Sequence, residues 1–186
     1  WRDWSSDVCS SDLVTSLLCG IDPGERTGWC LYDPDARRVV RACTMPQSAQ
    51  PTYDFFDDGS IPRRSVHYAI ERPKGYGVTY PDVVECGIVF GQLWERIANR
   101  TAEWLYRREV CMILSDATNG EVRVRNDSTA WAALCLLHGD GADRKPKVKK
   151  GIVVEPGGPL AGVRSHERAA IAVAVACFLK KGGKFS

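Results

Sequence analysis

The stretch VTSLLCGIDPGERTGWC (14–30) decides the fold. Its apolar run VTSLLCGID (14–22) is typical of a buried central strand that ends in an acid, and PGE forms the turn after it. TGWCLYD (27–33) and RVVRACTM (38–45) predict the next two strands, with a turn at the Asp-Pro-Asp of 33–35. We therefore expect the fold to begin with three antiparallel strands.

The rest of the chain alternates between strands and helices. SVHYAIE (65–71) and AEWLYR (102–107) predict two more strands. Apolar residues at helical spacing predict helices over 82–100, 108–118, 127–139 and 165–181, the last with Ser165 as its N-cap. Two polar, Pro-containing stretches, 46–64 and 140–164, predict loops, and 119–126 matches no pattern. The expected fold class is α/β, a mixed five-stranded sheet flanked by helices.

Residues 1–13, WRDWSSDVCSSDL, differ from the rest in composition. Residues 3–13 resemble one reading frame of a common short-read sequencing adapter, and position 1 is not Met. A disordered acidic leader is the alternative, since Ser and Asp bury little apolar surface. On either interpretation we expect a leader that ends at Leu13, a single domain over 14–181 and a tail over 182–186.

Charge, cysteine content and hydropathy bear on the partners and the compartment of the protein. The net charge is +2, and without the leader 24 basic and 20 acidic side chains remain, which is compatible with nucleic-acid binding but not diagnostic of it. The seven cysteines beyond Cys9 form no CxxC pair, which favours a reducing compartment. No apolar run reaches the ~20 residues of a membrane span. We expect a cytoplasmic protein.

Two acids stand at predicted strand ends. Asp22 ends the first strand and Glu71 ends the fourth. If these strands are neighbours, the two carboxylates lie together, and a hard divalent cation such as Mg²⁺ or Mn²⁺ would relieve their repulsion. Either acid alone reads more simply as a turn or cap residue. His166, in the first turn of the last helix, is a third candidate ligand; the alternative is that it caps the helix or lies on the surface. For Glu167 the simpler interpretation is an acid that favours the helix N-terminus.

These segments resemble the motifs of RuvC-type Holliday junction resolvases, the crossover junction endodeoxyribonucleases of the RNase H-like superfamily. GIDPGERTGW (20–29) resembles their first motif, AIERP (69–73) the second, and VVECGIVFGQLWERI (83–97) the long helix that follows. YRREV (106–110), the helix around DSTAWAAL and GPLAGVRSHERAAIAVAVA (158–176) resemble the remaining blocks, particularly those of phage-like members. The first motif is fairly specific, and the order of the weaker blocks supports it.

The resemblance implies an RNase H-like fold and a two-metal phosphodiester hydrolysis at Holliday junctions or other branched DNA. It implies catalytic roles for Asp22, Glu71 and His166 as ligands of two Mg²⁺ ions, with Mn²⁺ as a substitute. Glu167 lies roughly 100° round the helix from His166 and is a further catalytic candidate at the helix N-terminus. His166 ligates only when neutral, so activity should fall in acid. The family often has a second acid one turn after the His166 position, where this chain has Ala169.

DNA contacts are expected from three segments. The Gly-rich loop after Glu71 and the basic run 144–150 supply most of them, and ordinary loop chemistry or a solvated charged loop is the alternative for both. The expected DNA-binding residues are Lys74, Tyr76, Tyr80, Arg144, Lys145, Lys147, Lys149, Lys150, Arg164 and Arg168. The resemblance also implies a homodimer, because symmetric cuts call for two sites about a two-fold axis, in a bacterial cell or a phage that infects one.

Two other functions are weighed against the nuclease. Because Ala169 replaces an acid, the chain is alternatively a catalytically impaired protein that binds branched DNA. An actin- or heat-shock-type ATPase shares the strand-end Asp and the Gly-rich turn. That class predicts a far longer chain with a second phosphate loop, and the sequence has neither.

Overall fold

The computed structural model describes residues 17–46, 66–73, 81–97, 101–149 and 152–185. The leader expected over 1–13 lies outside the described residues, as does nearly all of the loop expected over 46–64. The main sheet contains β1 (Leu17–Asp22), β2 (Arg26–Asp33), β3 (Arg38–Pro46), β4 (Val66–Arg72) and β5 (Ala102–Tyr106). The helices are α1 (Pro81–Ile97), α2 (Arg107–Ala117), α3 (Asp127–His138) and α4 (Ser165–Lys180). The predicted α/β class with a mixed five-stranded sheet is confirmed.

The strand order is β3-β2-β1-β4-β5. β1 pairs antiparallel with β2, and β2 with β3, as predicted. β1 pairs parallel with β4, and β4 with β5. Ile21 lies opposite Ile70 in this register, so the next residues, Asp22 at the end of β1 and Glu71 one residue before the end of β4, lie at the same edge of the sheet.

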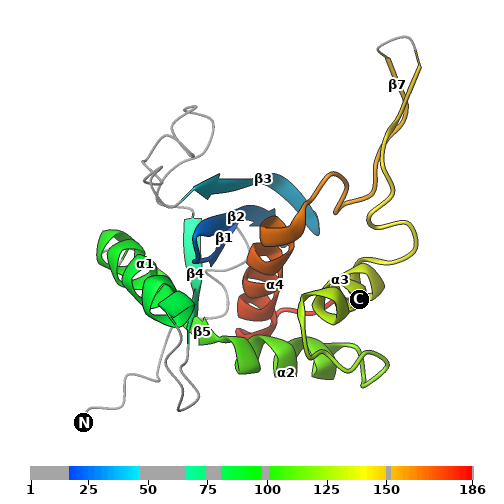
Figure 1. Ribbon diagram of the computed structural model, residues 1–186. Coiled ribbons are helices and arrows are strands. Elements are labelled where there is room, and N and C mark those ends of the chain that lie inside the picture. The colour runs from blue at the N-terminus through cyan, green and yellow to red at the C-terminus, as the bar shows by residue number, and fades with distance from the viewer. Residues whose placement is uncertain (1–16, 47–65, 74–80, 98–100, 150–151, 186) are drawn as a thin grey trace.

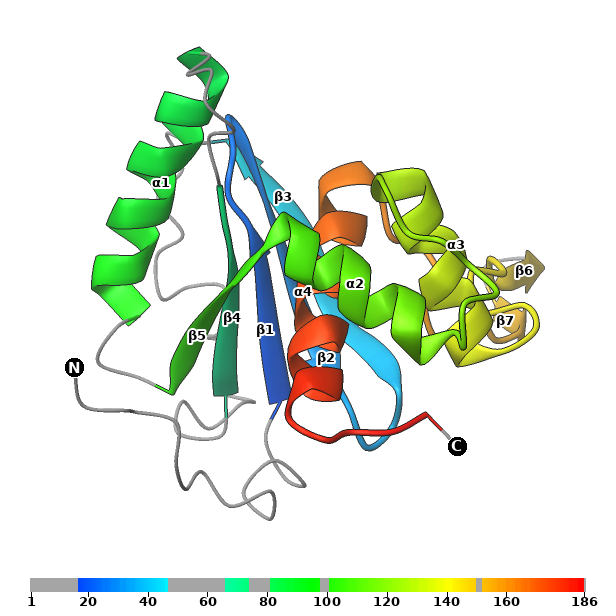
Figure 2. The ribbon, with the colours of Figure 1, turned by 90° about the horizontal axis from the view of Figure 1, so that it is seen from below.

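Helices cover both faces of the sheet, α1 on one and α2, α3 and α4 on the other (Figures 1 and 2). Side chains alternate between the faces along each strand. Cys19, Ile21 and Ile70 belong to the core cluster with α1 residues, whereas Leu18 and Ala69 belong to the cluster with α4. Asp22 and Glu71, four and two residues beyond Leu18 and Ala69, therefore face α4.

Two glycines let α4 approach the sheet closely. A Cβ atom at Gly20 of β1 would lie 1.9 Å from the Ala170 carbonyl oxygen, and one at Gly28 of β2 would lie 2.1 Å from the His166 carbonyl oxygen. Only hydrogen fits at these positions. The contact at Gly28 matters most for the site, because Gly28 pairs with Asp22 and so sets the start of α4 beside the end of β1.

The loop predicted over 140–164 is partly wrong. It contains a two-stranded antiparallel hairpin, β6 (Lys147–Lys149) and β7 (Ile152–Glu155), which projects from the body of the protein in Figure 1. Val148 and Val153 pair across it and each is 58% exposed. The described side chains of the hairpin are exposed or, at Glu155, half-buried, so no run of buried apolar residues marks these strands and lysines dominate the pattern in the sequence.

The C-terminal residues pack more closely than the expected tail implies. The Phe185 ring contacts the rings of Phe178 and His138, with centroids 5.9 and 5.0 Å away. None of the seven cysteines in the described segments forms a disulfide. Within those segments, no helix combines the length and apolar character that crossing a membrane requires.

Candidate active site

Asp22 and Glu71 lie next to each other at the carboxyl ends of β1 and β4 and are both largely shielded from solvent. Their side chains are 20% and 13% exposed. Each carboxylate lies at the end of an apolar strand and faces α4, so its charge loses most of its hydration. The predicted pairing of the two acids at one edge of the sheet agrees with the strand register.

Both carboxyl groups have raised pKa values. Burial raises the pKa of Asp22 to about 6, against the opposing effect of the Arg107 charge. Burial also raises the pKa of Glu71 to about 7; Arg107 acts to lower it, and the neighbouring Asp22 charge raises it further. At neutral pH, ionising these two buried and neighbouring carboxyl groups costs free energy, and a bound divalent cation would offset that cost. Carboxylate oxygens are also the donors that Mg²⁺ and Mn²⁺ prefer. The donor set fits a divalent metal.

Arg107 is a site residue that sequence reasoning missed. Its Nη1 atom lies 2.8 Å from Glu71 Oε2, and its Nη2 atom pairs with Asp127 Oδ1. Arg107 begins α2 directly after β5, and Asp127 begins α3. The feature that could have identified Arg107 is the parallel pairing of β4 with β5. This pairing sets Arg72 opposite Tyr106, so Arg107, the residue after Tyr106, lies at the same edge of the sheet as Glu71. Arg107 places a positive charge in direct contact with Glu71.

His166 lies beside Asp22, as the motif predicted. Its Nδ1 atom is 3.8 Å from Asp22 Oδ2, and its side chain is 44% exposed. The imidazole thus extends the pair of carboxylates toward solvent. Asp22 and Glu71 are shielded oxygen donors and His166 is an accessible nitrogen donor at one edge of the sheet, but the donor atoms of the three do not all lie within 4.8 Å of one another, so binding one ion together would require these side chains to move closer.

Glu167 and Ala169 do not extend this donor set. Glu167 Oε2 accepts a hydrogen bond of 2.9 Å from the Arg164 N–H, and Oε1 lies 3.5 Å from Thr44 Oγ1 of β3. The N-cap is therefore Arg164, not the predicted Ser165, because the Glu167 carboxylate satisfies the backbone at the start of the helix. Ala169, where the motif comparison led us to look for a second acid, is 3% exposed and packs in the core.

The expected DNA-binding residues fall into several groups. Lys74, Tyr76, Tyr80 and Lys150 lie outside the described residues, and only the backbone of Lys149 is described. Arg144, Lys145, Lys147 and Arg164 are exposed. Lys147 forms an ion pair with Glu155 at 2.9 Å. The Arg168 guanidinium lies over the Trp131 ring, 4.4 Å from its centroid, so this cation packs within the protein.

Comparisons with known proteins support the fold. No protein-family model matches this sequence, and no curated protein does either. Among solved structures, "T. thermophilus RuvC in complex with Holliday junction substrate" is 15% identical with a TM-score of 0.52, over 90% of this chain and 96% of that one. "Thermus thermophilus RuvC structure" is 14% identical with a TM-score of 0.51, over 90% and 97% of the two chains. At such identities the likeness concerns the fold alone, and the chain has a RuvC-type, RNase H-like fold.

Proposed function

We propose that this protein is a metal-dependent, structure-selective endodeoxyribonuclease that hydrolyses phosphodiester bonds at Holliday junctions or other branched DNA. The observation that carries the proposal is the Asp22–Glu71 pair, two shielded carboxyls with raised pKa values at adjacent parallel strand ends. His166 beside Asp22 adds a third donor. Branched DNA as the substrate rests on the likeness to a RuvC structure that holds a Holliday junction.

Asp22, Glu71 and His166 would hold Mg²⁺ or Mn²⁺, two ions per site being the arrangement we favour. Bound divalent ions would polarise the scissile phosphate and lower the pKa of an attacking water. The chain itself orients the donors through the fixed ends of β1 and β4 and the close contact of α4 at Gly28. Binding converts both carboxyls to their charged forms and holds the imidazole neutral.

Arg107 has two partners, Glu71 and the largely exposed Asp127. If a bound cation neutralised the charge of Glu71, the guanidinium would keep its ion pair with Asp127 and would be free to contact a phosphate oxygen. Arg164, exposed two residues before His166, is the other cation placed to meet the DNA backbone. We propose that both guanidiniums position the strand to be cut.

A second candidate function is binding of branched DNA without cleavage. Ala169 buries a methyl group where the family has an acid, and Arg107 already partners Glu71. A site with fewer carboxylates would hold one ion weakly and cleave slowly. Under this second candidate function the protein binds the same branched DNA but does not hydrolyse it.

The experiment uses the full chain with a labelled four-way junction and a linear duplex of the same sequence, in Mg²⁺, Mn²⁺ or EDTA. A nuclease gives paired nicks on the junction only, with metal. Paired nicks would also support the homodimer that we propose, which sedimentation measures independently. A retarded junction without product in any metal supports the binding-only function. Absence of both binding and cleavage contradicts both candidates.

The metal-free protein should lose stability as pH rises through the range in which its two carboxyls ionise. Their folded pKa values, about 6 and 7, lie above the ordinary values near 4. Between about pH 4 and pH 7 the folded state therefore binds more protons than the unfolded state, and the free energy of unfolding falls as pH rises. Asp22→Asn should raise the stability of the metal-free protein on the order of 2 kcal/mol at about pH 8.

Thermal unfolding in EDTA across this range is the measurement. The gain from Asp22→Asn should disappear near pH 4, where the native Asp22 is already neutral, and Mg²⁺ should stabilise the unsubstituted chain far more than the variant. A gain that is the same at both pH values would show that Asp22 carries no ionisation cost in the folded protein.

A further inference from the structure

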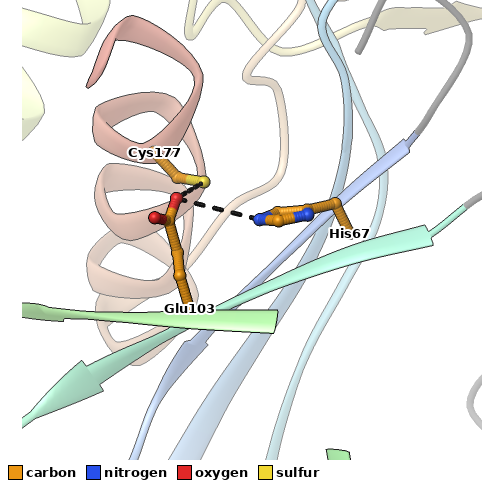
Figure 3. A group of neighbouring side chains, drawn as sticks. All are labelled: His67, Glu103 and Cys177. Carbon is orange, nitrogen blue, oxygen red and sulfur yellow. Dashed lines mark hydrogen bonds and ion pairs between the residues drawn. The ribbon is translucent and has the colours of Figure 1, made fainter. Parts of the chain in front are cut away.

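A second group of potential metal ligands lies at the other end of the face covered by α4. It consists of His67 near the start of β4, Glu103 near the start of β5 and Cys177 near the end of α4 (Figure 3). One donor atom from each residue lies within 4.8 Å of the other two. His67 is on the same face of β4 as Glu71, four residues earlier, which is roughly 13 Å along a strand. The two groups are therefore separate sites.

Within this group, His67 is the side chain that lacks hydrogen-bond partners in the part of the chain that the structure describes. Cys177 Sγ donates to Glu103 Oε1 at 2.6 Å, while His67 Nε2 lies 3.7 Å from the same oxygen, beyond hydrogen-bond length. His67 is 3% exposed, and neither of its ring nitrogens has a hydrogen-bond partner among the described residues. A buried imidazole without a partner is costly. Figure 3 shows its ring directed at the Glu103 carboxylate, from which it is separated by the 3.7 Å between His67 Nε2 and Glu103 Oε1.

We propose that His67, Glu103 and Cys177 bind one Zn²⁺ ion, with water as the fourth ligand. Imidazole nitrogen, thiolate sulfur and carboxylate oxygen are the donors that Zn²⁺ accepts in tetrahedral geometry, whereas Mg²⁺ requires oxygen. The ion would bridge the 3.7 Å gap and give the imidazole its missing partner. Water reaches the fourth position from the side of Glu103, whose side chain is 24% exposed, while Cys177 is fully buried.

The charges around the group are compatible with a cation. Burial acts to raise the pKa of Glu103, but His67, Cys177 and Lys181 outweigh it and lower that pKa. Glu103 is thus negative at neutral pH. Burial and the Glu103 charge raise the pKa of the Cys177 thiol, which stays protonated until a metal displaces the proton. Lys181 Nζ lies 3.8 Å from Glu103 Oε1 as the counter-charge that Zn²⁺ would replace. Each ion bound releases about one proton, so affinity rises with pH.

The site would serve stability and not the cutting reaction. Its ligands join β4, β5 and the last turn of α4, and the closest pair in space, Glu103 and Cys177, is 74 residues apart in the sequence. Cys177 lies eleven residues after His166, roughly 16 Å along the helix. A Zn²⁺ ion at this end would fix the C-terminal half of α4 to the sheet and leave the candidate active site at the other end accessible to DNA.

The test uses the full chain after removal of metals by a chelator. Titration with Co²⁺, a spectroscopic substitute for Zn²⁺, should give thiolate-to-cobalt charge-transfer absorption and tetrahedral ligand-field bands that saturate at one ion per chain, and Zn²⁺ should displace them. A Zn²⁺ concentration 100-fold above the Kd should raise the melting temperature by about 5–10 °C. Cys177→Ala and His67→Gln should abolish the charge-transfer band or weaken binding at least ~10²-fold.

Two controls separate this site from other thiols and from the carboxylate pair. Cys135→Ala, at a half-buried cysteine outside the group, should leave the Co²⁺ spectrum unchanged. The double variant Asp22→Asn, Glu71→Gln should still bind one Zn²⁺ per chain. A wild-type spectrum without thiolate charge transfer overturns the proposal, even where Cys177→Ala fails to fold. A band that persists in Cys177→Ala also overturns it.

Discussion

Glu71→Gln is expected to lower metal-dependent cleavage of a four-way junction by about 10³-fold, with junction affinity unchanged within about twofold. Removal of one group that stabilises charge in a transition state costs ~10²–10³ in rate, and Glu71 would also be a ligand of the metal. The amide keeps the shape of the side chain and its contact with Arg107, whose guanidinium then donates to the amide oxygen. Asp22→Asn should behave in the same way.

A matched substitution identifies what the carboxylate contributes. Asp140→Asn removes one negative charge from an exposed position after α3, so its effect on net charge is identical. It should leave cleavage within about twofold. Single-turnover rates with saturating protein separate the chemical step from binding, which gel retardation in EDTA measures directly. Cleavage by Glu71→Gln at the rate of Asp140→Asn would remove Glu71 from the mechanism.

Gly20→Ala is expected to cost about 3 kcal/mol or more in the free energy of unfolding. The new Cβ atom would stand 1.9 Å from the Ala170 carbonyl oxygen and 2.9 Å from the Ala174 Cβ atom. Those atoms belong to a buried helix and cannot rotate away, so α4 as a whole must move off β1. Overpacking of a tight core costs ~1–3 kcal/mol even where side chains yield.

Gly91→Ala is the control for Gly20→Ala. Gly91 lies within α1, and a Cβ atom there would meet nothing within 4 Å. The same change should stabilise by up to ~1 kcal/mol, since Gly is a poor helix former. Denaturant unfolding of both variants measures the difference. If Gly20→Ala were as stable as Gly91→Ala, α4 would not lie against β1 as described.

The local pattern of apolar and acidic residues in the sequence predicts much of the sheet and the carboxylate pair. Apolar runs that end in an acid placed Asp22 and Glu71 at strand ends, and parallel neighbours bring such ends together. The position of His166 followed from the small-residue helix after it, whose alanines pack on the sheet. Apolar residues that recur every two residues predict strands, and those that recur about every 3.6 residues predict helices, so the sequence shows these elements directly.

The features that escaped prediction depend on tertiary placement. Arg107 reaches Glu71 only because α2 begins at the end of β5, and its bond to Asp127 requires the orientation of α3. The Glu167 carboxylate accepts from the Arg164 N–H and so caps the start of α4, a contact that the sequence did not indicate, while its catalytic role stays a prediction. His67, Glu103 and Cys177 come from three separate elements with no motif spacing, so only the folded chain assembles them.

The most direct test of the proposed function is the position of a bound ion. Crystals of the full chain grown with Mn²⁺ should show anomalous scattering at about 2 Å from carboxylate oxygens of both Asp22 and Glu71. The same peak should be absent from Glu71→Gln crystals. Anomalous density at this edge of the sheet would establish Asp22 and Glu71 as metal ligands. If crystals in saturating Mn²⁺ show no peak there and the Glu71–Arg107 ion pair is intact, the metal-dependent nuclease that we propose is contradicted.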